Sequence, residues 1–498
     1  MTIISSAKVR STTRSLAVFV FDKGHNDTIQ TLQVPARLKK ALKRIARHFP
    51  SELLKVGVFP INDASIDVVV VVNIGKKKDA SPLVFMRAFR AAARALSDAH
   101  QQTAAYIIPD ISIPDITIAF LAAQHVPMAL YTFSSYRKHI KKKPPRVSVE
   151  LVFPHQISHP DQIKKSIAEG KIIAEEINVA RDLSNTPGGD MTPTVLAEHA
   201  QRTGKRCGFH VTILSEKQMK ALGMGGVVGV SRGSSEESKF IVCEYTHSSA
   251  RSTKPVVFVG KGVTFDAGGL NIKPEMSMYE MHLDMSGGAA VIHAIAAIAR
   301  LKIPVKLVGL IPAVENMPGG SGYRPGDILR SYNGKTIEVK NTDAEGRIIL
   351  ADALGYAKKF KPECIIDVAT LSGSTLVALG QRVSALLSPD KKLSSQLIAA
   401  GEMSGDRVWP LPLWPEYKAD LVSDFADIAN ITKTKFGGTI TASMFLWEFT
   451  PTDRWAHIDI ASTMTVLPED NLAPGAKGSG VNLLVTFIKE HYGNSAKH

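Results

Sequence analysis

The feature that most constrains the fold is an apolar run followed at once by glycines and charged residues. Residues 255–259 (PVVFV) predict a short buried strand, and Gly260 and Gly262 predict a turn after it. Acidic and basic side chains then follow up to residue 274. Charged residues placed directly after a core strand are typical of the edge where a parallel α/β sheet opens its ligand crevice. We therefore expect an α/β fold with a polar site at this edge.

A second charged segment covers residues 341–347 (NTDAEGR). Asp343 and Glu345 are two residues apart, so in an extended segment their carboxylates point to the same side. Gly346 permits a tight turn, and Arg347 follows beside the acids. Two oxygen ligands next to a fixed cation indicate half of a metal site with an oxyanion partner. A strand end or helix cap with a solvated acid pair is the alternative for these residues taken alone.

A third segment, residues 281–288 (MHLDMSGG), leads into an Ala- and Ile-rich stretch that predicts a helix over about 289–300. Asp284 therefore lies at or just before a helix start. By itself this position favours an ordinary N-cap role.

Together the three segments resemble the leucyl aminopeptidase family of two-metal exopeptidases, the cytosolic aminopeptidase group that includes bacterial aminopeptidase A. The resemblance covers roughly residues 175–490, whereas the N-terminal third matches only in overall layout. The family's order and spacing are present in the strings GKGVTFDAGG, NIKP, LDMSGGAAV, ENMPGG, RPGD and NTDAEGR.

The resemblance implies two divalent metal ions per subunit, zinc or manganese, with magnesium or cobalt as alternatives. The implied metal ligands are Lys261, Asp266, Asp284, Asp343 and Glu345. Asp266 and Glu345 would bridge the two ions, because five ligands fill two sites only by sharing. Lys261 binds a metal only as the free amine, so its pKa must fall far below about 10.4, as a desolvated position beside two dications would cause.

The same resemblance makes Lys273 and Arg347 the catalytic side chains. Lys273 would stabilise the oxyanion that develops on the scissile carbonyl. Arg347 is too basic to be a general base, and it is expected to hold a bicarbonate that relays the proton. The nucleophile would be a hydroxide that bridges the metals, while one metal holds the free α-amine and so restricts cleavage to N-terminal residues.

The implied pocket for the first side chain of the substrate is apolar. Its residues would be Met281, Thr370, Gly373, Ala461 and Met464. Methionines and small residues suit leucine or similar side chains, although all five positions are also compatible with an ordinary core. The chain departs from the family at Ser462, where many relatives carry glycine, and at Leu371-Ser372-Gly373, where Leu-Thr-Gly is more usual, so the first-residue preference stays open.

A chain of 498 residues with 44% hydrophobic content is long enough for two globular domains. The first 150 residues alternate predicted strands with predicted helices, which indicates an α/β domain. These strands cover 16–21, 66–72 and 147–153, and the helices about 36–49 and 82–99. We expect a smaller N-terminal α/β domain with an oligomeric or regulatory role over 1–160, a linking helix over 161–184, and a larger α/β catalytic domain with a mixed central sheet over 185–498.

The net charge of +14 is concentrated at one end of the chain. Residues 1–170 carry 25 Lys and Arg against 12 Asp and Glu, a balance of +13. The predicted basic helix over 36–47 and the run over 137–146 are compatible with a nucleic-acid surface. No aromatic side chains interleave them as stacking platforms would, so solvated charge is the favoured explanation. A DNA-binding or architectural protein with secondary peptidase activity is the alternative function.

The remaining features limit the location and the class of protein. No uninterrupted apolar run reaches the roughly 18 residues of a membrane span. Cys207, Cys243 and Cys364 fit neither a disulfide framework nor a CxxC site, which favours a reducing compartment. Residues 1–21 are basic, serine-containing and free of acids, as in a mitochondrial transit peptide, but 15–21 also predict a strand. We expect a cytoplasmic protein, with the mitochondrial matrix as the alternative, and the resemblance implies a homohexamer acting on peptides.

One motif points to a different chemistry. Residues 229–233 (GVSRG) fit the spacing of the nucleophile elbow of serine hydrolases, but a polar stretch follows where that motif requires a helix. No histidine pair forms HExxH, so a mononuclear zinc peptidase is not supported.

Overall fold

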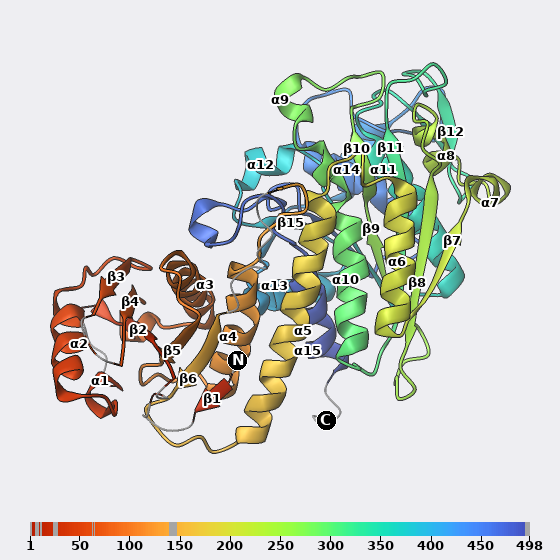
Figure 1. Ribbon diagram of the computed structural model, residues 1–498. Helices are drawn as coiled ribbons and strands as arrows, with labels where there is room; N and C mark the ends of the chain where they lie inside the picture. Colours follow the sequence, from red (N-terminus) through yellow and green to blue (C-terminus); the bar gives the residue numbers. More distant parts are fainter. Residues whose placement is uncertain are drawn as a thin grey trace. The chain divides into compact units, whose positions relative to one another are not determined.

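The computed structural model describes residues 2–4, 9, 12–22, 28–61, 63, 65–138 and 147–493. The chain divides into two compact units (Figure 1). The first comprises Met1–Glu175 and Val466–Pro474, and the second Glu176–Thr465 and Gly475–His498. Helix α5 (Pro160–Asn185) runs from the first unit into the second, over the residues for which the sequence predicts a linking helix. The roles assigned to the two domains stay predictions.

The first unit is built on a six-stranded sheet that is parallel apart from β3. Both faces of β2 are buried, because Ala17 and Phe19 pack into the core with α3 and α4 while Leu16 and Val18 pack into the core with α2. In sheet order the strands are β1 (Thr2–Ile4), β6 (Ser148–Val152), β5 (Thr103–Ile107), β2 (Ser15–Val20), β4 (Val68–Asn73) and β3 (Val56–Pro60). The helices are α1 (Thr28–Thr31), α2 (Ala36–His48), α3 (Pro82–Asp98) and α4 (Asp115–Ala129), with a 3-10 turn η2 (Lys77–Asp79).

The second unit has a nine-stranded mixed sheet, which confirms the predicted mixed central sheet. Its central strands β18, β14, β9 and β11 run parallel, while β15, β8 and β7 add antiparallel pairs. In order the strands are β16 (Val408–Pro410), β15 (Ser384–Leu387), β18 (Trp455–Asp459), β14 (Cys364–Ala369), β9 (Val256–Gly260), β11 (Lys306–Asn316), β8 (Lys239–Thr246) and β7 (His210–Leu214). Strand β10 (Gly262–Asp266) pairs with the C-terminal end of β11.

Helices cover both faces of this sheet, giving three layers (Figure 1). One face carries α6 (Pro193–Cys207), α10 (Ser286–Arg300), α13 (Lys391–Ser404) and α15 (Val481–Tyr492). The other carries α8 (Gly225–Ser231), α11 (Glu345–Ala357) and α14 (Gly438–Trp447). Shorter elements are α7 (Glu216–Ala221), α9 (Glu275–Met278), α12 (Ser374–Leu379), the 3-10 turns η3 (Met281–Met285), η4 (Lys358–Phe360), η5 (Pro415–Leu421) and η6 (Pro468–Asp470), and a small sheet of β12 (Ile328–Arg330), β13 (Thr336–Glu338) and β17 (Ile428–Ala429).

One helical stretch of the described chain, Glu275–Arg300, is long and apolar enough to cross a membrane by length and composition. However, 89% of its most apolar window is buried inside the unit. A core helix beneath a sheet accounts for this composition.

The turn predicted at Gly260 and Gly262 is wrong. The chain continues from β9 directly into β10, with Lys261 between the two strands. Glycine is required there for close packing, since a Cβ at 260 would lie 2.6 Å from the carbonyl oxygen of Gly287 and a Cβ at 262 would lie 2.7 Å from that of Pro312. The turn comes after β10 instead, where Gly268 and Gly269 have φ of 89° and 62°.

Candidate active site

The residues assigned from the sequence gather at the carboxyl ends of the central parallel strands, beside the starts of α10 and α11. In a parallel α/β sheet this edge is where ligands bind. A cavity of about 210 Å³ opens here. All twelve assigned residues line it: Lys261, Asp266, Lys273, Met281, Asp284, Asp343, Glu345, Arg347, Thr370, Gly373, Ala461 and Met464.

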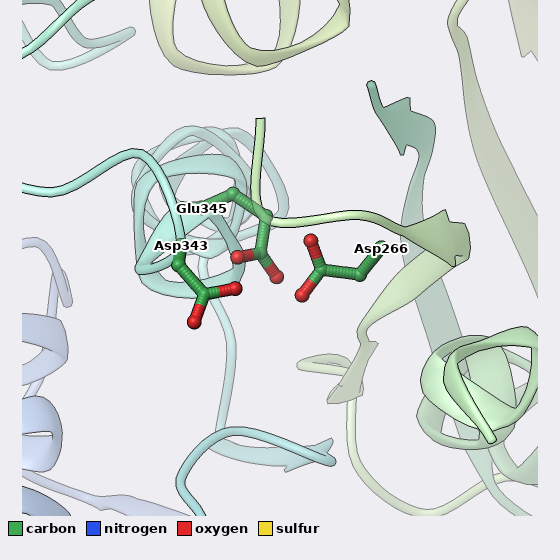
Figure 2. Close-up of side chains that lie close together, drawn as sticks. All are labelled: Asp266, Asp343 and Glu345. Carbon is green, nitrogen blue, oxygen red and sulfur yellow. The ribbon is translucent and has the colours of Figure 1, made fainter. Parts of the chain in front are cut away.

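Three carboxylates face one another across this cavity (Figure 2). Asp266 is the last residue of β10, Asp343 lies in a turn, and Glu345 begins α11. Each offers an oxygen, and these oxygens all lie within 4.8 Å of one another. The extended conformation expected for residues 343–345 is wrong. The carboxylates nevertheless converge, because the turn and the helix start bring Glu345 back toward Asp343.

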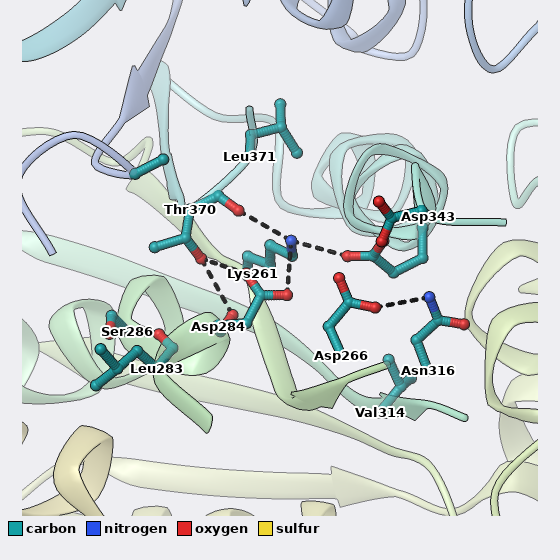
Figure 3. A network of polar contacts seen from close by, with 12 residues as sticks. Lys261, Asp266, Leu283, Asp284, Ser286, Val314, Asn316, Asp343, Thr370 and Leu371 are labelled. Atoms are coloured by element: carbon teal, nitrogen blue, oxygen red, sulfur yellow. Dashed lines mark hydrogen bonds and ion pairs between the residues drawn. The ribbon is translucent and has the colours of Figure 1, made fainter. Parts of the chain in front are cut away.

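Lys261 lies at the centre of a buried ionic cluster (Figure 3). Its Nζ is 2.8 Å from Asp284 Oδ2 and 2.8 Å from Glu345 Oε1, and it donates to the carbonyl oxygen of Thr370 at 2.9 Å. Gly346 leaves room for this side chain, because a Cβ there would lie 2.6 Å from Lys261 Cε. Close approach to Lys261 therefore accounts for glycine in the NTDAEGR segment.

Asp284 does not cap the helix that follows it. It lies in η3, and α10 begins at Ser286 without a side-chain cap. Besides its ion pair with Lys261, Asp284 accepts a hydrogen bond from Thr370 Oγ1 at 2.6 Å. The N-cap alternative is therefore wrong, and the carboxylate is directed into the cluster.

Lys273 binds a second pair of acids. Its Nζ lies 2.9 Å from Asp266 Oδ2 and 2.5 Å from Asp343 Oδ1. The loop that carries it is held by Thr342, whose Oγ1 donates to the Gly268 carbonyl at 2.6 Å and accepts from the Asn271 amide at 2.8 Å. Packing between two distant loops thus sets the position of this ammonium group.

The cluster contains more negative than positive charge, since four carboxylates face two ammonium groups. Burial, together with Glu345, raises the pKa of Asp266 to about 6, and burial raises the pKa of Asp284 to about 8. Burial also raises the pKa of Asp343. Burial lowers the pKa of Lys261, but Asp284, Glu345 and Asp266 raise it more, so it lies above its ordinary value.

These observations fit divalent metal ions. The carboxylates supply hard oxygen ligands, and the raised pKa values of Asp266, Asp284 and Asp343 mark a site short of positive charge. Burial raises the pKa of Glu345, but Lys261 and Lys273 lower it more, so it lies below its ordinary value. In this structure the two lysine ammonium groups occupy the space between the acids. The residues that could hold metal are Asp266, Asp284, Asp343 and Glu345. Lys261 could join them only as the free amine, whereas in this structure the acids around it raise its pKa and favour the ammonium form.

Arg347 lies at the edge of the cavity in the first turn of α11. It is 8% exposed, and its Nη1 donates to the carbonyl oxygen of Asn430 at 2.8 Å. Burial lowers its pKa to about 10, although Glu345 and Asp459 oppose this shift. Its buried Nε has no hydrogen-bond partner among the described residues, so the guanidinium retains a free donor.

The sequence left some cavity residues without a role. Leu371 and Ser372, which the sequence singles out only as a departure from the family pattern, lie just after β14 and line the cavity. No charged residue follows this strand, so the signal that identifies the segment after β9 is absent here. The other unassigned lining residues are Ser277, Ala344, Gly346 and Leu376.

The serine-hydrolase motif is not built as that chemistry requires. Ser231 is the last residue of α8, where a nucleophile elbow would need a strand followed by a turn. Its hydroxyl is buried and donates to the Val228 carbonyl oxygen at 3.1 Å.

Comparison with known proteins assigns both parts of the chain. Residues 178–485 match the model for the cytosol aminopeptidase family, catalytic domain, and residues 17–139 match the N-terminal domain of that family. A probable cytosol aminopeptidase of Azoarcus sp. is 43% identical over 426 residues, covering 84% of each chain. Another, from Chlorobaculum tepidum, is 46% identical over 355 residues, covering 71% of this chain and 70% of the relative.

The chain is also similar to solved structures over nearly its whole length. The bottromycin maturation enzyme BotP has a TM-score of 0.83 and 31% identity, and the match covers 96% of this chain and 99% of that one. A structure of BotP in complex with Mn has the same TM-score, with 30% identity.

Proposed function

This chain belongs to the cytosol aminopeptidase family, a family of metal-dependent exopeptidases, and from this premise we propose that it uses two divalent ions to remove leucine and similar apolar residues from the N-termini of peptides. One observation carries the proposal: five potential metal ligands from three separate segments converge on a single cavity, together with Lys273 and Arg347.

The proposed roles follow from charge and position. Asp266 and Glu345 would be shared by both ions, Lys261 and Asp284 would complete one site, and Asp343 the other. When bound, the ions would lower the pKa of a water toward about 7 and polarise the scissile carbonyl. A buried Asp284 is kept in place by Thr370, so this ligand is oriented before substrate arrives.

Lys273 would stabilise the charge that develops on the carbonyl oxygen. Asp266, Glu345 and Asp343 raise its pKa although burial lowers it, so the side chain stays an ammonium donor. Its ion pairs to Asp266 and Asp343 keep it at the edge of the metal ligands.

Arg347 would hold a bicarbonate that relays a proton. The free Nε donor supports this role, because a buried guanidinium with an unused donor can accept an oxyanion. The anion itself would carry out the proton transfer, since the guanidinium is too basic to do so.

The preference for leucine is supported by the lining of the cavity. Met281, Met464, Ala461, Leu371 and Leu376 present apolar surface. Manganese or zinc are the favoured metals, with magnesium or cobalt as alternatives, and the Mn complex of BotP supports manganese. A homohexamer remains our expectation from the family.

We also propose a cytoplasmic location, because the bacterial relatives carry the name cytosol aminopeptidase, and none of the comparisons favours the mitochondrial alternative. For the alternative function, DNA binding, the basic helix α2 is the surface that we propose. The run over 137–146 lies, from residue 139 on, outside the described residues.

The direct test is hydrolysis of leucine p-nitroanilide by protein stripped with a chelator and reloaded with Mn²⁺ or Zn²⁺. We expect activity to return only with metal. The matched substrate N-acetyl-leucine p-nitroanilide, which lacks the free amine, should not be cleaved. Equal cleavage of both substrates, or full activity of the stripped protein, would show that the proposed function is wrong.

A further inference from the structure

Asp459 is a buried carboxylate next to the cavity that has no role in the proposed chemistry. It is the last residue of β18 and is 0% exposed. Among the described residues it forms no ion pair. It instead accepts four hydrogen bonds, which is the full capacity of a carboxylate held by neutral donors.

Three of the donors are backbone amides in two different loops, and the fourth is the hydroxyl of Thr375 in the first turn of α12. Oδ1 accepts from the amides of Leu371 and Ala461, each at 3.1 Å. Oδ2 accepts from the amide of Ser372 at 3.1 Å and from Thr375 Oγ1 at 2.7 Å. One loop follows β14 and the other follows β18, and in the sheet register Ala369 lies beside Asp459.

These two loops form walls of the cavity. Leu371, Ser372 and Ala461 all line it, and so do Thr370, Gly373 and Met464 on the same segments. The proposed site for the first side chain of the substrate is therefore bounded by backbone that a single carboxylate holds together.

We propose that Asp459 is a positioning residue that fixes the two walls of the first-side-chain pocket against each other and so sets which N-terminal residue the enzyme accepts. The inference rests on the proposed aminopeptidase function and adds a determinant of its specificity. It also explains why the side chain is a carboxylate. An asparagine side chain has one acceptor oxygen, so it could accept the hydrogen bonds of only one of the two donor pairs. Its NH₂ group, which is a donor, would then face the other two donors and could not accept from them.

The test compares D459N with a matched variant of another buried aspartate. Asp352 is also 0% exposed and accepts backbone hydrogen bonds, from Val227 at 2.8 Å and Tyr332 at 2.7 Å, but none of these three residues lines the cavity. D352N therefore reproduces the loss of a buried carboxylate without touching the pocket walls.

We expect D459N to retain the metal content of the wild type while KM for leucine p-nitroanilide rises about tenfold and the leucine-to-alanine ratio of kcat/KM falls at least about fivefold. D352N should leave that ratio unchanged, whatever its effect on stability. A general loss of folding would lower the active fraction and kcat for both substrates equally, so it cannot produce this change in selectivity.

T375V provides a second measurement if D459N does not fold, because it removes one donor to Asp459 and keeps the carboxylate. Its selectivity ratio should fall in the same direction by a smaller factor, about twofold. Unchanged selectivity in T375V and in any folded D459N, with an active wild type, would overturn the inference alone. A wild type that cleaves no free-amine substrate would overturn the proposed function itself.

Discussion

The basic side chains on one face of helix α2 in the first unit lie in solvent, whereas Lys261 of the second unit lies inside the protein and contacts acids. Helix α2 buries Leu38, Leu42 and Ala46 on one side. Its exposed residues include Arg37, Lys40, Lys43, Arg44 and Arg47. In the second unit Lys261 is 3% exposed and pairs with Asp284 and Glu345, which are 4% and 2% exposed.

The net charge of a region and the burial of its charged side chains therefore indicate different properties of the protein. Nearly all the net charge lies in residues 1–170, while residues 171–498 carry 35 basic against 34 acidic side chains. Burial of a charge is costly unless partners compensate it, so a buried cluster of acids and lysines indicates a functional site. A solvated basic face carries no such cost and indicates at most weak attraction to anions.

The largest effect should come from removing an acid of the buried cluster. Asp266→Ala removes a ligand proposed to serve both ions, so metal content and activity should fall together, with activity reduced at least about 10³-fold. Elemental analysis and leucine p-nitroanilide turnover measure both.

The control for this variant is Asp67→Ala in the first unit, where the carboxylate is half-exposed and pairs with Arg14. It should retain metal and activity. Two full equivalents of metal in Asp266→Ala would contradict the shared-ligand assignment.

The next effect separates catalysis from metal binding. Lys273→Ala leaves every proposed ligand in place, so metal content should stay near normal while kcat falls about 10²–10³-fold, as for the loss of one oxyanion donor. Lys43→Ala, on the exposed face of α2, should change neither. A raised KM with unchanged kcat would make Lys273 a substrate-binding residue instead.

A third effect concerns stability. Burial raises the pKa of Glu176, but hydrogen bonds from His293, Arg206 and Arg300 lower it to about 2. A carboxyl group whose pKa is lowered on folding stabilises the folded protein at pH values above its ordinary pKa, here 4.5. This stabilisation is lost as the pH falls from 4.5 toward about 2. Glu176→Gln should therefore lower the free energy of unfolding of the second unit by about 3 kcal/mol at pH 7.

Urea unfolding followed by tryptophan fluorescence measures this effect, because Trp409, Trp414, Trp447 and Trp455 all lie in the second unit. The difference from wild type should be complete above about pH 4.5 and should shrink at lower pH. Breaking the exposed Arg14–Asp67 pair with Asp67→Asn should cost less than about 1 kcal/mol. Equal losses of unfolding free energy in Glu176→Gln and Asp67→Asn would contradict the difference between buried and exposed charge pairs.

The smallest effect is expected at the basic helix. DNA should bind weakly at low salt, with log K falling by about 0.9 per phosphate neutralised, and binding should vanish near physiological salt. Charge reversal at Lys39, Lys40 and Lys43 should abolish this binding and leave peptide hydrolysis unchanged. A sequence-selective gel shift that persists at about 0.15 M salt would favour the DNA-binding alternative.

Local sequence patterns predicted several elements of the fold. Apolar runs identified β2, β4, β6 and β9, and the helical stretches predicted between the first strands correspond to α2 and α3, because these signals depend on neighbouring residues. The predicted turn at Gly260 and Gly262 failed for a non-local reason. Those glycines accommodate Gly287 and Pro312, which approach from other parts of the chain.

The amino-acid sequence alone establishes the chemical types of the site, which are four acids, two lysines and an arginine in three separate segments. Which of these side chains touch depends on the folded protein. Lys261 pairs with Asp284 and Glu345, Lys273 pairs with Asp266 and Asp343, and Asp459 joins two loops that lie nearly 90 residues apart in the chain. The reason is physical: residue type and local conformation depend on neighbours in the chain, whereas contacts between distant residues depend on how the strands and helices pack around a common core.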